Sequence, residues 1–180
     1  MVTCDDCDRP IQADTVVDAK TVMSRCKSCR SLAHHHRSLR ITPLTRTDLE
    51  LVLAWRSNPK IYRHFRHQME PLDWDEHVEW FESRSQRRHD FIVRFDERRV
   101  GVVSLSADEE VSVYLGDFSA HGYGVATATL EWLCDRFVKR TPFIAEIHEE
   151  NNPSIRLFER CGFERTHRNG DWLYYEYRSA

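Results

Sequence analysis

Alternating hydrophobic and polar residues open the most informative stretch of the chain, residues 111–138. Hydrophobic residues at 111, 113 and 115 alternate with polar or small ones at a period of two, which is typical of a strand with one buried face. Beyond two glycines, hydrophobic residues recur at helical spacing, at Val125, Ala128, Trp132, Leu133 and Phe137. The pattern therefore predicts a strand that leads through a glycine-containing turn into a helix.

The remaining hydrophobic patterns predict further strands and helices. Strands are expected over residues 40–44, 90–95, 99–105, 142–148, 163–166 and 172–177, and helices over 49–55, within 60–84 and over 151–162. Thr45 or Thr47 together with Glu50 offers an N-cap for the first helix. The strand over 142–148 follows a crossover helix, so it is expected to lie parallel to the strand over 111–116.

Composition indicates a globular protein of ordinary polarity. Of the 180 residues, 41% are hydrophobic and 31% are charged, and the length suits one domain with a small appendage. No apolar run approaches the roughly 20 residues that span a bilayer. Acidic residues occupy the N-terminal stretch where a signal peptide would have a basic start. We therefore expect a cytoplasmic protein with no membrane partner.

Charge is distributed unevenly along the chain, although the net charge is only -3. Residues 1–40 carry seven Lys or Arg against five Asp, and the part from residue 20 to residue 40 contains six of these basic residues and no acid. A protein or nucleic-acid partner of negative charge could bind this basic 20–40 segment. A solvated linker explains the same composition, and the sequence leaves both alternatives open.

Four cysteines near the N-terminus have the spacing of a zinc site. Cys4 and Cys7 form one CxxC pair, Cys26 and Cys29 form another, and 18 residues separate the two pairs. Two such turns bring four thiolates around a tetrahedral metal ion. A reducing cytoplasm disfavours disulfides, and the thioredoxin-like context of a redox CxxC pair is missing. We expect a structural zinc module with its linker at residues 1–38 and a second domain at 39–180.

The glycine turn is a candidate phosphate site. Gly122 and Gly124 have no Cβ, so a ligand can approach their N–H groups closely. These groups belong to the start of a helix, where unpaired donors and the helix dipole attract phosphate. An ordinary strand-to-helix turn is the alternative.

Two elements in this order resemble the GNAT superfamily of N-acetyltransferases. The run Ser119–Gly124 resembles the pyrophosphate loop of that family, Arg/Gln-x-x-Gly-x-Gly/Ala, and Glu150–Phe163 resembles its second coenzyme A element. Ser119 departs from the family pattern, so one side-chain donor is missing. The resemblance implies acetyl-CoA as co-substrate, with its pantetheine arm in the wedge between two parting strands. The implied cofactor-binding residues are Tyr114, Leu115, Gly116, His121, Gly122, Tyr123, Gly124, Val125, Ala126, Asn151, Ser154 and Phe158.

The resemblance also implies the fold class. It is an α+β GNAT fold, a mixed, mostly antiparallel sheet of six to seven strands flanked by about four helices, here preceded by a zinc ribbon or knuckle.

A narrower resemblance concerns the acceptor. Trp55–Asn58 and Glu76–Phe81 are similar to the "WRN … EHxxWF" pattern of acetyltransferases that act on nucleotide-linked 4-amino sugars, the pseudaminic-acid type. Arg56, His77 and Trp80 would then bind the substrate, because a sugar nucleotide needs cations for its phosphates and flat apolar faces for its rings. Such relatives pair through sheet edges, which makes a homodimer one alternative. For the aromatic residues Trp55, Trp80 and Phe81, packing in the hydrophobic core is the alternative to substrate binding.

Acetyl transfer to an amine needs a base, a stabilised oxyanion and a proton for the departing thiolate. By family spacing Glu146 would be the base, and the position of the usual tyrosine acid is Phe158, which cannot donate a proton. Ser154 lies one helical turn earlier on the same face and is the alternative acid.

The sequence therefore predicts an acetyl-CoA-dependent N-acetyltransferase that acts on a primary amine of a small or nucleotide-linked acceptor, with an amino sugar favoured. One alternative is an acetyltransferase whose zinc module recruits a protein N-terminus, a lysine or a modified nucleic-acid base. The other is a non-catalytic module that binds coenzyme A and zinc.

Overall fold

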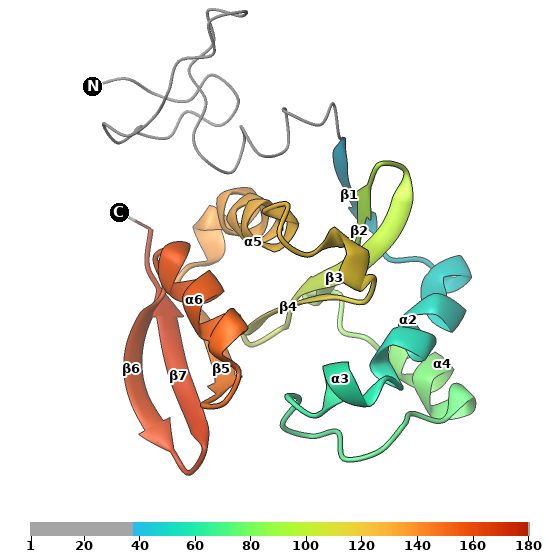
Figure 1. Ribbon diagram of the computed structural model, residues 1–180, viewed down its shortest axis with the longest axis horizontal. Helices are drawn as coiled ribbons and strands as arrows, with labels where there is room; N and C mark the ends of the chain where they lie inside the picture. The colour runs from blue at the N-terminus through green and yellow to red at the C-terminus, as the bar shows by residue number, and fades with distance from the viewer. Residues whose placement is uncertain (1–37, 180) are drawn as a thin grey trace, which may run out of the picture.

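The computed structural model describes residues 38–179, which fold into two β-sheets with helices around them (Figure 1). The four predicted zinc ligands and most of the basic 20–40 segment lie outside the described residues. In chain order the elements are β1 (Leu39–Pro43), η1 (Arg46–Asp48), α2 (Leu49–Arg56), α3 (Pro59–Tyr62), α4 (Trp74–Glu82), β2 (His89–Phe95), β3 (Arg98–Leu105), β4 (Val111–Leu115), η2 (Phe118–Ala120), α5 (Val125–Arg136), η3 (Val138–Arg140), β5 (Phe143–His148), α6 (Asn152–Arg160), β6 (Glu164–Asn169) and β7 (Trp172–Tyr177).

The first sheet is an antiparallel meander in the order β1-β2-β3-β4. The predicted hairpin of residues 90–95 and 99–105 is confirmed by β2 and β3. Asp96 and Glu97 connect these strands with φ angles of 51° and 62°, the left-handed conformation that a two-residue hairpin turn requires. A register shift between Val93 and Arg94 adds local twist to β2.

The second sheet is also antiparallel, in the order β5-β7-β6. The predicted tight hairpin is confirmed, but its two turn residues are Gly170, with a φ of 58°, and Asp171, since Asn169 still pairs with Trp172. The α+β class and the mostly antiparallel pairing are therefore confirmed. The seven strands of residues 38–179 divide into a four-stranded and a three-stranded sheet, which one isolated parallel bridge joins.

The expected parallel pairing of β4 with β5 is reduced to one contact. Among the described residues an isolated parallel bridge joins Glu110 to Ile144, and the Ile144 N–H donates to the Glu109 carbonyl at 3.0 Å. Beyond this bridge β4 and β5 have no ladder, since β5 takes its strand partner from β7. The two strands therefore present unpaired edges to each other.

The two faces of the first sheet pack against different helices, which lie on opposite sides of it (Figure 1). Val93, Val103 and Leu105 are buried with side chains of α5 and of the second sheet. Ile92 and Val102 are buried on the other face with residues of α2. Because side chains alternate along a strand, each strand contributes to both clusters.

Side-chain caps fix where the helices begin and end. The capping box at the start of η1 joins Thr45 to Asp48, not to Glu50 as the sequence suggested. Asp73 caps α4 through the N–H groups of residues 75 and 76. Gly162 ends α6 with a φ of 89°, and the N–H of Phe163 donates back to the Phe158 carbonyl at 3.0 Å.

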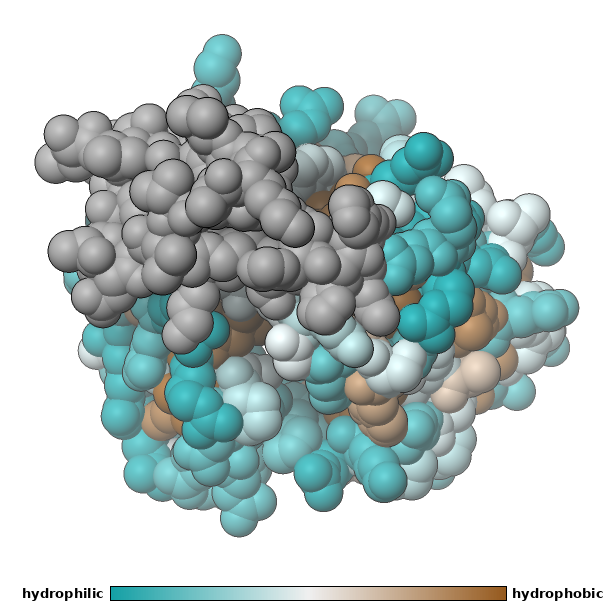
Figure 2. All heavy atoms as spheres, turned by 45° about the horizontal axis from the view of Figure 1, so that its top comes forward, coloured by the Kyte–Doolittle hydropathy of each residue, from teal (hydrophilic) through white to brown (hydrophobic). Residues whose placement is uncertain are grey.

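The exposed surface is mostly hydrophilic, and hydrophobic residues form separate patches on the face shown in Figure 2. The large hydrophobic residues that are most exposed are Met69, Trp74, Phe118, Val138 and Ile144. None of the helices among residues 38–179 is long and apolar enough to cross a membrane.

Candidate active site

A cavity of about 1340 Å³ lies where β4 and β5 part. Its wall is made by β4, the glycine turn, the ends of β5 and α6, and the segment between α2 and α4. Residues of this wall that were predicted for cofactor, substrate or catalysis are Arg56, Trp80, Tyr114, Leu115, His121, Gly122, Gly124, Val125, Ala126, Glu146, Asn151, Ser154 and Phe158. Elements far apart in the sequence thus supply one continuous chamber.

The glycine turn opens α5 towards this chamber. Gly122 and Gly124 have φ angles of 82° and 79°, which a residue with a Cβ adopts only with strain. Gly124 is the N-cap of the 12-residue helix and gives it no side-chain cap, so the first N–H groups of α5 are left to other partners. A Cβ at Gly122 would meet no described atom within 4 Å. This space and these donors fit a diphosphate group.

Ser119, which departs from the family pattern, already has partners in the protein. Its hydroxyl donates to Asp117 at 2.6 Å and accepts from the guanidinium of Arg98 at 3.2 Å. Arg98 comes from β3, and it also pairs with Asp117 at 3.0 Å. The loop is therefore held from the side by a charged network instead of offering a long side-chain donor.

Three predicted residues do not line the chamber. Tyr123 packs against Phe95 with ring centroids 5.6 Å apart, and Gly116 lies under the ring of Trp55. His77 is 3% exposed and lies behind Trp80, stacked on it with centroids 5.3 Å apart. These three residues support the wall from behind, because a ligand in the chamber meets their neighbours first.

His77 is kept neutral by this position. Burial lowers the pKa of His77, and the nearby charge of Arg56 lowers it further. Its buried Nε2 has no hydrogen-bond partner among the described residues. Direct contact of a neutral, buried imidazole with a substrate phosphate, as the sequence suggested, does not follow from this geometry.

The polar floor of the chamber comes from one face of β4 and β5. On β4 the side chains of Val111, Val113 and Leu115 turn to the core, so residues 110, 112 and 114 face the opposite way. On β5 the buried residues 143, 145 and 147 alternate with Ile144, Glu146 and His148. Glu146, predicted from the family spacing, therefore faces the chamber.

Glu146 is already engaged by Arg66, which also binds Tyr174. The Nη1 of Arg66 donates to its Oε2 at 2.6 Å and also to the hydroxyl of Tyr174. These hydrogen bonds raise the pKa of Arg66, so its guanidinium stays charged. The sequence reasoning missed Arg66, which lies 80 positions from Glu146 and is brought to it by the segment between α3 and α4.

The start of α6 places Ser154 and Phe158 on the chamber wall. Asn151 caps the helix by accepting from the Ser154 N–H at 3.3 Å. Phe158 is 4% exposed and packs edge-to-face on Phe163, with centroids 4.9 Å apart. The hydroxyl of Ser154 is thus the proton-bearing group of this pair.

Cationic side chains dominate the acceptor end of the chamber. Between residues 51 and 69 the chain contains no acid. The basic residues of this part that line the chamber are Arg56, Lys60, Arg63, His64, Arg66 and His67. Charge patterning along the sequence could have found this group, which we call the cationic wall.

Arg56 lies at the inner end of the cationic wall. Its Nε and Nη2 donate to the neutral amide oxygen of Gln68 at 3.2 and 2.9 Å, and its guanidinium lies 5.0 Å from the centroid of Phe65. Burial lowers the pKa of Arg56 from its very high ordinary value. No described carboxylate forms an ion pair with Arg56, which leaves its charge for a ligand.

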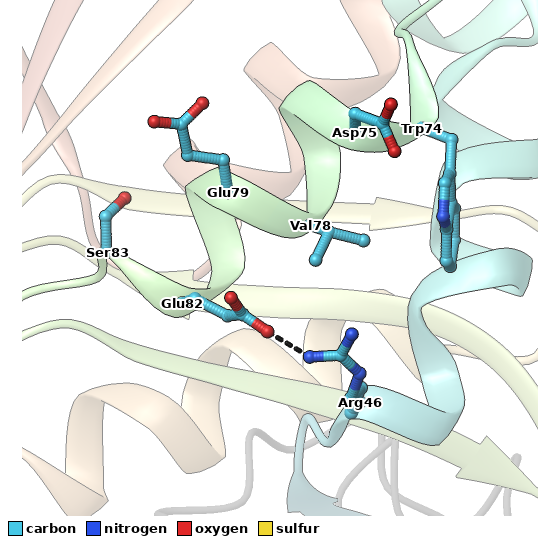
Figure 3. Close-up of a pocket in the computed structure, with 7 residues that line it drawn as sticks. All are labelled: Arg46, Trp74, Asp75, Val78, Glu79, Glu82 and Ser83. Atoms are coloured by element: carbon cyan, nitrogen blue, oxygen red, sulfur yellow. Dashed lines mark hydrogen bonds and ion pairs between the residues drawn. The ribbon is translucent and has the colours of Figure 1, made fainter.

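A smaller hollow of about 570 Å³ lies on the outer face of α4. Arg46 of η1 reaches across it to Glu82, and Trp74 closes the other end (Figure 3). None of the residues predicted for cofactor, substrate or catalysis lines this hollow. The residues predicted for chemistry therefore gather at the large chamber and not at this hollow.

Comparison with known proteins agrees with this geometry. A family model described as an acetyltransferase (GNAT) domain matches residues 38–164. An uncharacterized protein of Methanocaldococcus jannaschii is 36% identical over 161 residues, which cover 82% of this chain and 32% of that protein. The chain thus spans about a third of the length of this curated relative.

Solved structures show the same fold. A crystal structure of a domain from Methanocaldococcus jannaschii has a TM-score of 0.73 and 35% identity, over 78% of this chain and 97% of that one. Spermidine N-acetyltransferase from Vibrio cholerae, solved with CoA and spermine, has a TM-score of 0.65 and 18% identity, over 77% and 92% of the two chains. Since the family model covers well over half of the sequence, the chain belongs to the acetyltransferase (GNAT) family.

Proposed function

We propose that the protein transfers the acetyl group of acetyl-CoA to a primary amine. The observation that carries the proposal is the start of α5, where two left-handed glycines leave open space and uncapped N–H groups beside a wide chamber. Such a helix start binds phosphate groups, since donors and dipole act together. Family membership supports the same cofactor.

The parted strands suit the rest of the cofactor. The unpaired edges of β4 and β5 offer backbone N–H and C=O groups, with which the amides of a pantetheine arm can pair like an added strand. The cofactor supplies an acetyl thioester, whose carbonyl carbon is the electrophile. The residues of this chain bind and orient it and handle the protons.

Proton transfer is proposed to use the polar floor and α6. A carboxylate on the face of Glu146 takes a proton from the acceptor ammonium, and the lone pair of the amine can then attack. Ser154 is proposed to donate to the leaving thiolate, since Phe158 has no proton to give. The C–N bond forms as the C–S bond breaks, which yields an amide and a free thiol.

The acceptor is proposed to carry negative charge in addition to its amine, as a nucleotide-linked amino sugar of the pseudaminic-acid type does. The cationic wall supports this, because its charges lie along the chamber and Arg56 has only a neutral partner. Trp80 lines the same chamber, and the guanidinium groups of Arg84 and Arg88 lie over its ring. A nucleotide-linked acceptor would place its phosphates on the cationic wall and its amine near the thioester.

A second candidate acceptor is a macromolecule. The two CxxC pairs and the basic 20–40 segment favour it, since a zinc module of about 38 residues can recruit a protein or nucleic acid. The N-terminal boundary at residue 38, the zinc ion and the cytoplasmic location stay predictions. If no amine is acetylated, the remaining alternative is a protein that binds coenzyme A without catalysis.

Matched glycine variants test the cofactor site. Gly122 and Gly170 both have a positive φ and open space around a new Cβ, so Gly122→Ala and Gly170→Ala introduce a similar backbone strain. Only residue 122 lies at the proposed diphosphate. We expect Gly122→Ala to weaken acetyl-CoA binding at least about tenfold in calorimetry, beyond any effect of Gly170→Ala, because a methyl group would take up ligand space. Equal affinities in both variants would contradict the assignment.

Charge reversal tests the acceptor. Lys60→Glu and Arg63→Glu change exposed residues of the cationic wall. For a nucleotide-linked 4-amino sugar we expect KM to rise at least about tenfold, with an effect that weakens at high salt. For spermidine, a cationic amine, KM should not rise. Mass spectrometry of the amine after incubation with acetyl-CoA identifies the product. An absence of product from every amine tested would refute the enzymatic proposal.

A further inference from the structure

Glu110 is a carboxylate of the chamber that the mechanism above does not use, as are Asp90, which Arg84 and Arg88 bind, and Glu150, which follows β5. It precedes β4 and shares the face of Ser112 and Tyr114, since side chains alternate along the strand. The parallel bridge pairs it with Ile144, so Glu110 and Glu146 lie on one face of the junction, two positions apart in register. Glu110 therefore stands where β4 and β5 begin to part.

Hydrogen bonds with Ser106 and Ile144 fix the backbone around Glu110. The Ser106 N–H donates to the Glu110 carbonyl at 2.9 Å, and the Glu110 N–H donates to the Ser106 hydroxyl at 3.0 Å. The Ile144 N–H holds the preceding carbonyl at 3.0 Å. Such a turn fixes the place from which the carboxylate extends, as a proton-transfer group requires.

The carboxylate itself is not engaged by the protein. The neighbouring Glu109 pairs with Arg87 at 2.8 Å and with Arg140 at 2.5 Å. Glu146 is bound by Arg66, and the same guanidinium also donates to the hydroxyl of Tyr174. Among the described residues, the side chain of Glu110 has no hydrogen bond and no ion pair, and it is an exposed residue that lines the chamber.

The charges around Glu110 differ from those around Glu146. Desolvation raises the pKa of Glu110, and the negative charge of Glu146 on β5 raises it further. Arg88, His67 and Arg66, from the segments before β2 and between α3 and α4, act in the opposite direction without cancelling the rise. A carboxylate with a raised pKa holds a transferred proton better than one locked to a guanidinium.

We propose that Glu110, in place of Glu146, is the general base that removes the proton from the acceptor amine. The inference rests on the proposed acetyl transfer. The ammonium gives one proton to the Glu110 carboxylate, and the neutral amine attacks the thioester carbonyl. The second proton of the nitrogen leaves as the C–S bond breaks and the thiolate is protonated. Glu146 then acts as a positioning residue that holds Arg66 and raises the basicity of Glu110.

Three variants of the full-length protein test this. Glu110→Gln removes the proposed base, Glu146→Gln removes its neighbour, and Asp108→Asn removes an exposed carboxylate whose side chain has no described partner. The amines tried are a nucleotide-linked 4-amino sugar, glucosamine 6-phosphate, spermidine and a lysine peptide. The rate is followed as thiol release and confirmed by product mass.

We expect Glu110→Gln to lower kcat at least about 100-fold with acetyl-CoA affinity and melting temperature preserved. Glu146→Gln should lower kcat less than about tenfold and move the ascending limb of kcat/KM to lower pH, because a repelling charge is gone. Asp108→Asn should match the wild type. Hydroxylamine serves as a control acceptor, because it is neutral at pH 7.5 and needs no base to remove a proton before attack. With hydroxylamine, the ratio of the wild-type rate to the Glu110→Gln rate should fall towards one.

The outcomes separate the two proposals. If the wild type acetylates an amine while Glu110→Gln keeps kcat within about threefold, or if its defect persists with hydroxylamine, the assignment of Glu110 is overturned and acetyl transfer stands. A larger loss in Glu146→Gln than in Glu110→Gln would return the role to Glu146. If the wild type yields no product from any amine, the proposed function fails, and the role of Glu110 fails with it.

Discussion

The indole ring of Trp55 lies against the backbone of Gly116, so closely that a Cβ on this glycine would be 2.1 Å from ring atoms Cγ and Cδ2. Trp55 belongs to α2 and Gly116 follows β4, so the contact joins α2 to the strand that borders the proposed cofactor site. The sequence placed Gly116 among the cofactor contacts. The structure gives it a packing role, since only a residue without Cβ leaves room for the ring.

Gly116→Ala should therefore destabilise the fold. Either the ring or the strand must move, which we expect to cost about 1–3 kcal/mol in urea unfolding. In a Trp55→Val background the same substitution should cost less than about 0.5 kcal/mol, because the clash is gone. Acetyl-CoA affinity should change less than about threefold. A large loss of affinity without loss of stability would instead return Gly116 to the cofactor site.

Asp48 should make the free energy of unfolding depend on pH. Burial alone would raise the pKa of Asp48, but hydrogen bonds from Thr45 and Arg99 outweigh burial, so the pKa is lowered. Its carboxylate accepts from the Thr45 N–H at 2.9 Å and from Arg99 at 3.1 Å. A depressed folded-state pKa contributes stability above the unfolded value of about 3.9, and this contribution is lost as pH falls through the folded value.

Asp48→Asn should accordingly cost about 1–3 kcal/mol at pH 7, and the difference from wild type should shrink below about pH 4. Urea unfolding between pH 3 and pH 7 measures it. Asp108→Asn is the control, since an exposed carboxylate without a described side-chain partner should shift stability by less than about 0.5 kcal/mol. A pH-independent difference for Asp48→Asn would show that shape, not charge, is what the site needs.

Ser154→Ala tests the proposed proton donor. If the hydroxyl serves the leaving thiolate, kcat should fall about 100-fold at unchanged acetyl-CoA affinity. Steady-state kinetics with calorimetric binding separates the two effects. A weaker affinity at unchanged kcat would make Ser154 a cofactor contact only.

Phe158→Tyr should not rescue the reaction. The ring is 4% exposed and packs on Phe163, so an added hydroxyl enters a buried place and costs about 1–3 kcal/mol if it finds no partner. We expect a lower melting temperature and no gain in kcat. A rate increase would show that the position still serves as the acid site known from the family pattern.

The zinc module can be tested in the full chain. We expect about one zinc ion per chain by elemental analysis, and its loss in the double variant Cys26→Ser with Cys29→Ser, because four thiolates complete the tetrahedral site. Acetyl-CoA affinity should be unchanged, since the proposed cofactor site lies wholly within residues 114–158. Wild-type protein that contains no zinc after purification without chelators would refute the module.

The sequence predicted those features that depend on local pattern. The hairpin turns at Asp96–Glu97 and Gly170–Asp171 are set by residues next to one another, and α5 begins where the two glycines end. The fold class was implied by the resemblance to the GNAT family, which rests on two such local motifs. The glycines of the cofactor turn were found for the same reason, because their role depends on backbone conformation alone.

Features that depend on distant contacts could not be predicted. Nothing near Glu146 in the sequence indicates that Arg66 binds it, and nothing near Gly116 indicates the ring of Trp55. His77 is polar, which suggested a substrate contact, but in the structure it is buried behind Trp80 and does not line the chamber. Glu110 was within reach of the alternation rule, since it continues the phase of Ser112 and Tyr114 by one step.

The single bridge between β4 and β5 has a mechanical consequence. Each sheet is held together by its own ladder of backbone hydrogen bonds. Among the described residues, one isolated bridge at Glu110 is the only backbone pairing between β4 and β5. A ligand that pairs with both strand edges would therefore add backbone hydrogen bonds between two sheets that otherwise share mainly a hydrophobic core.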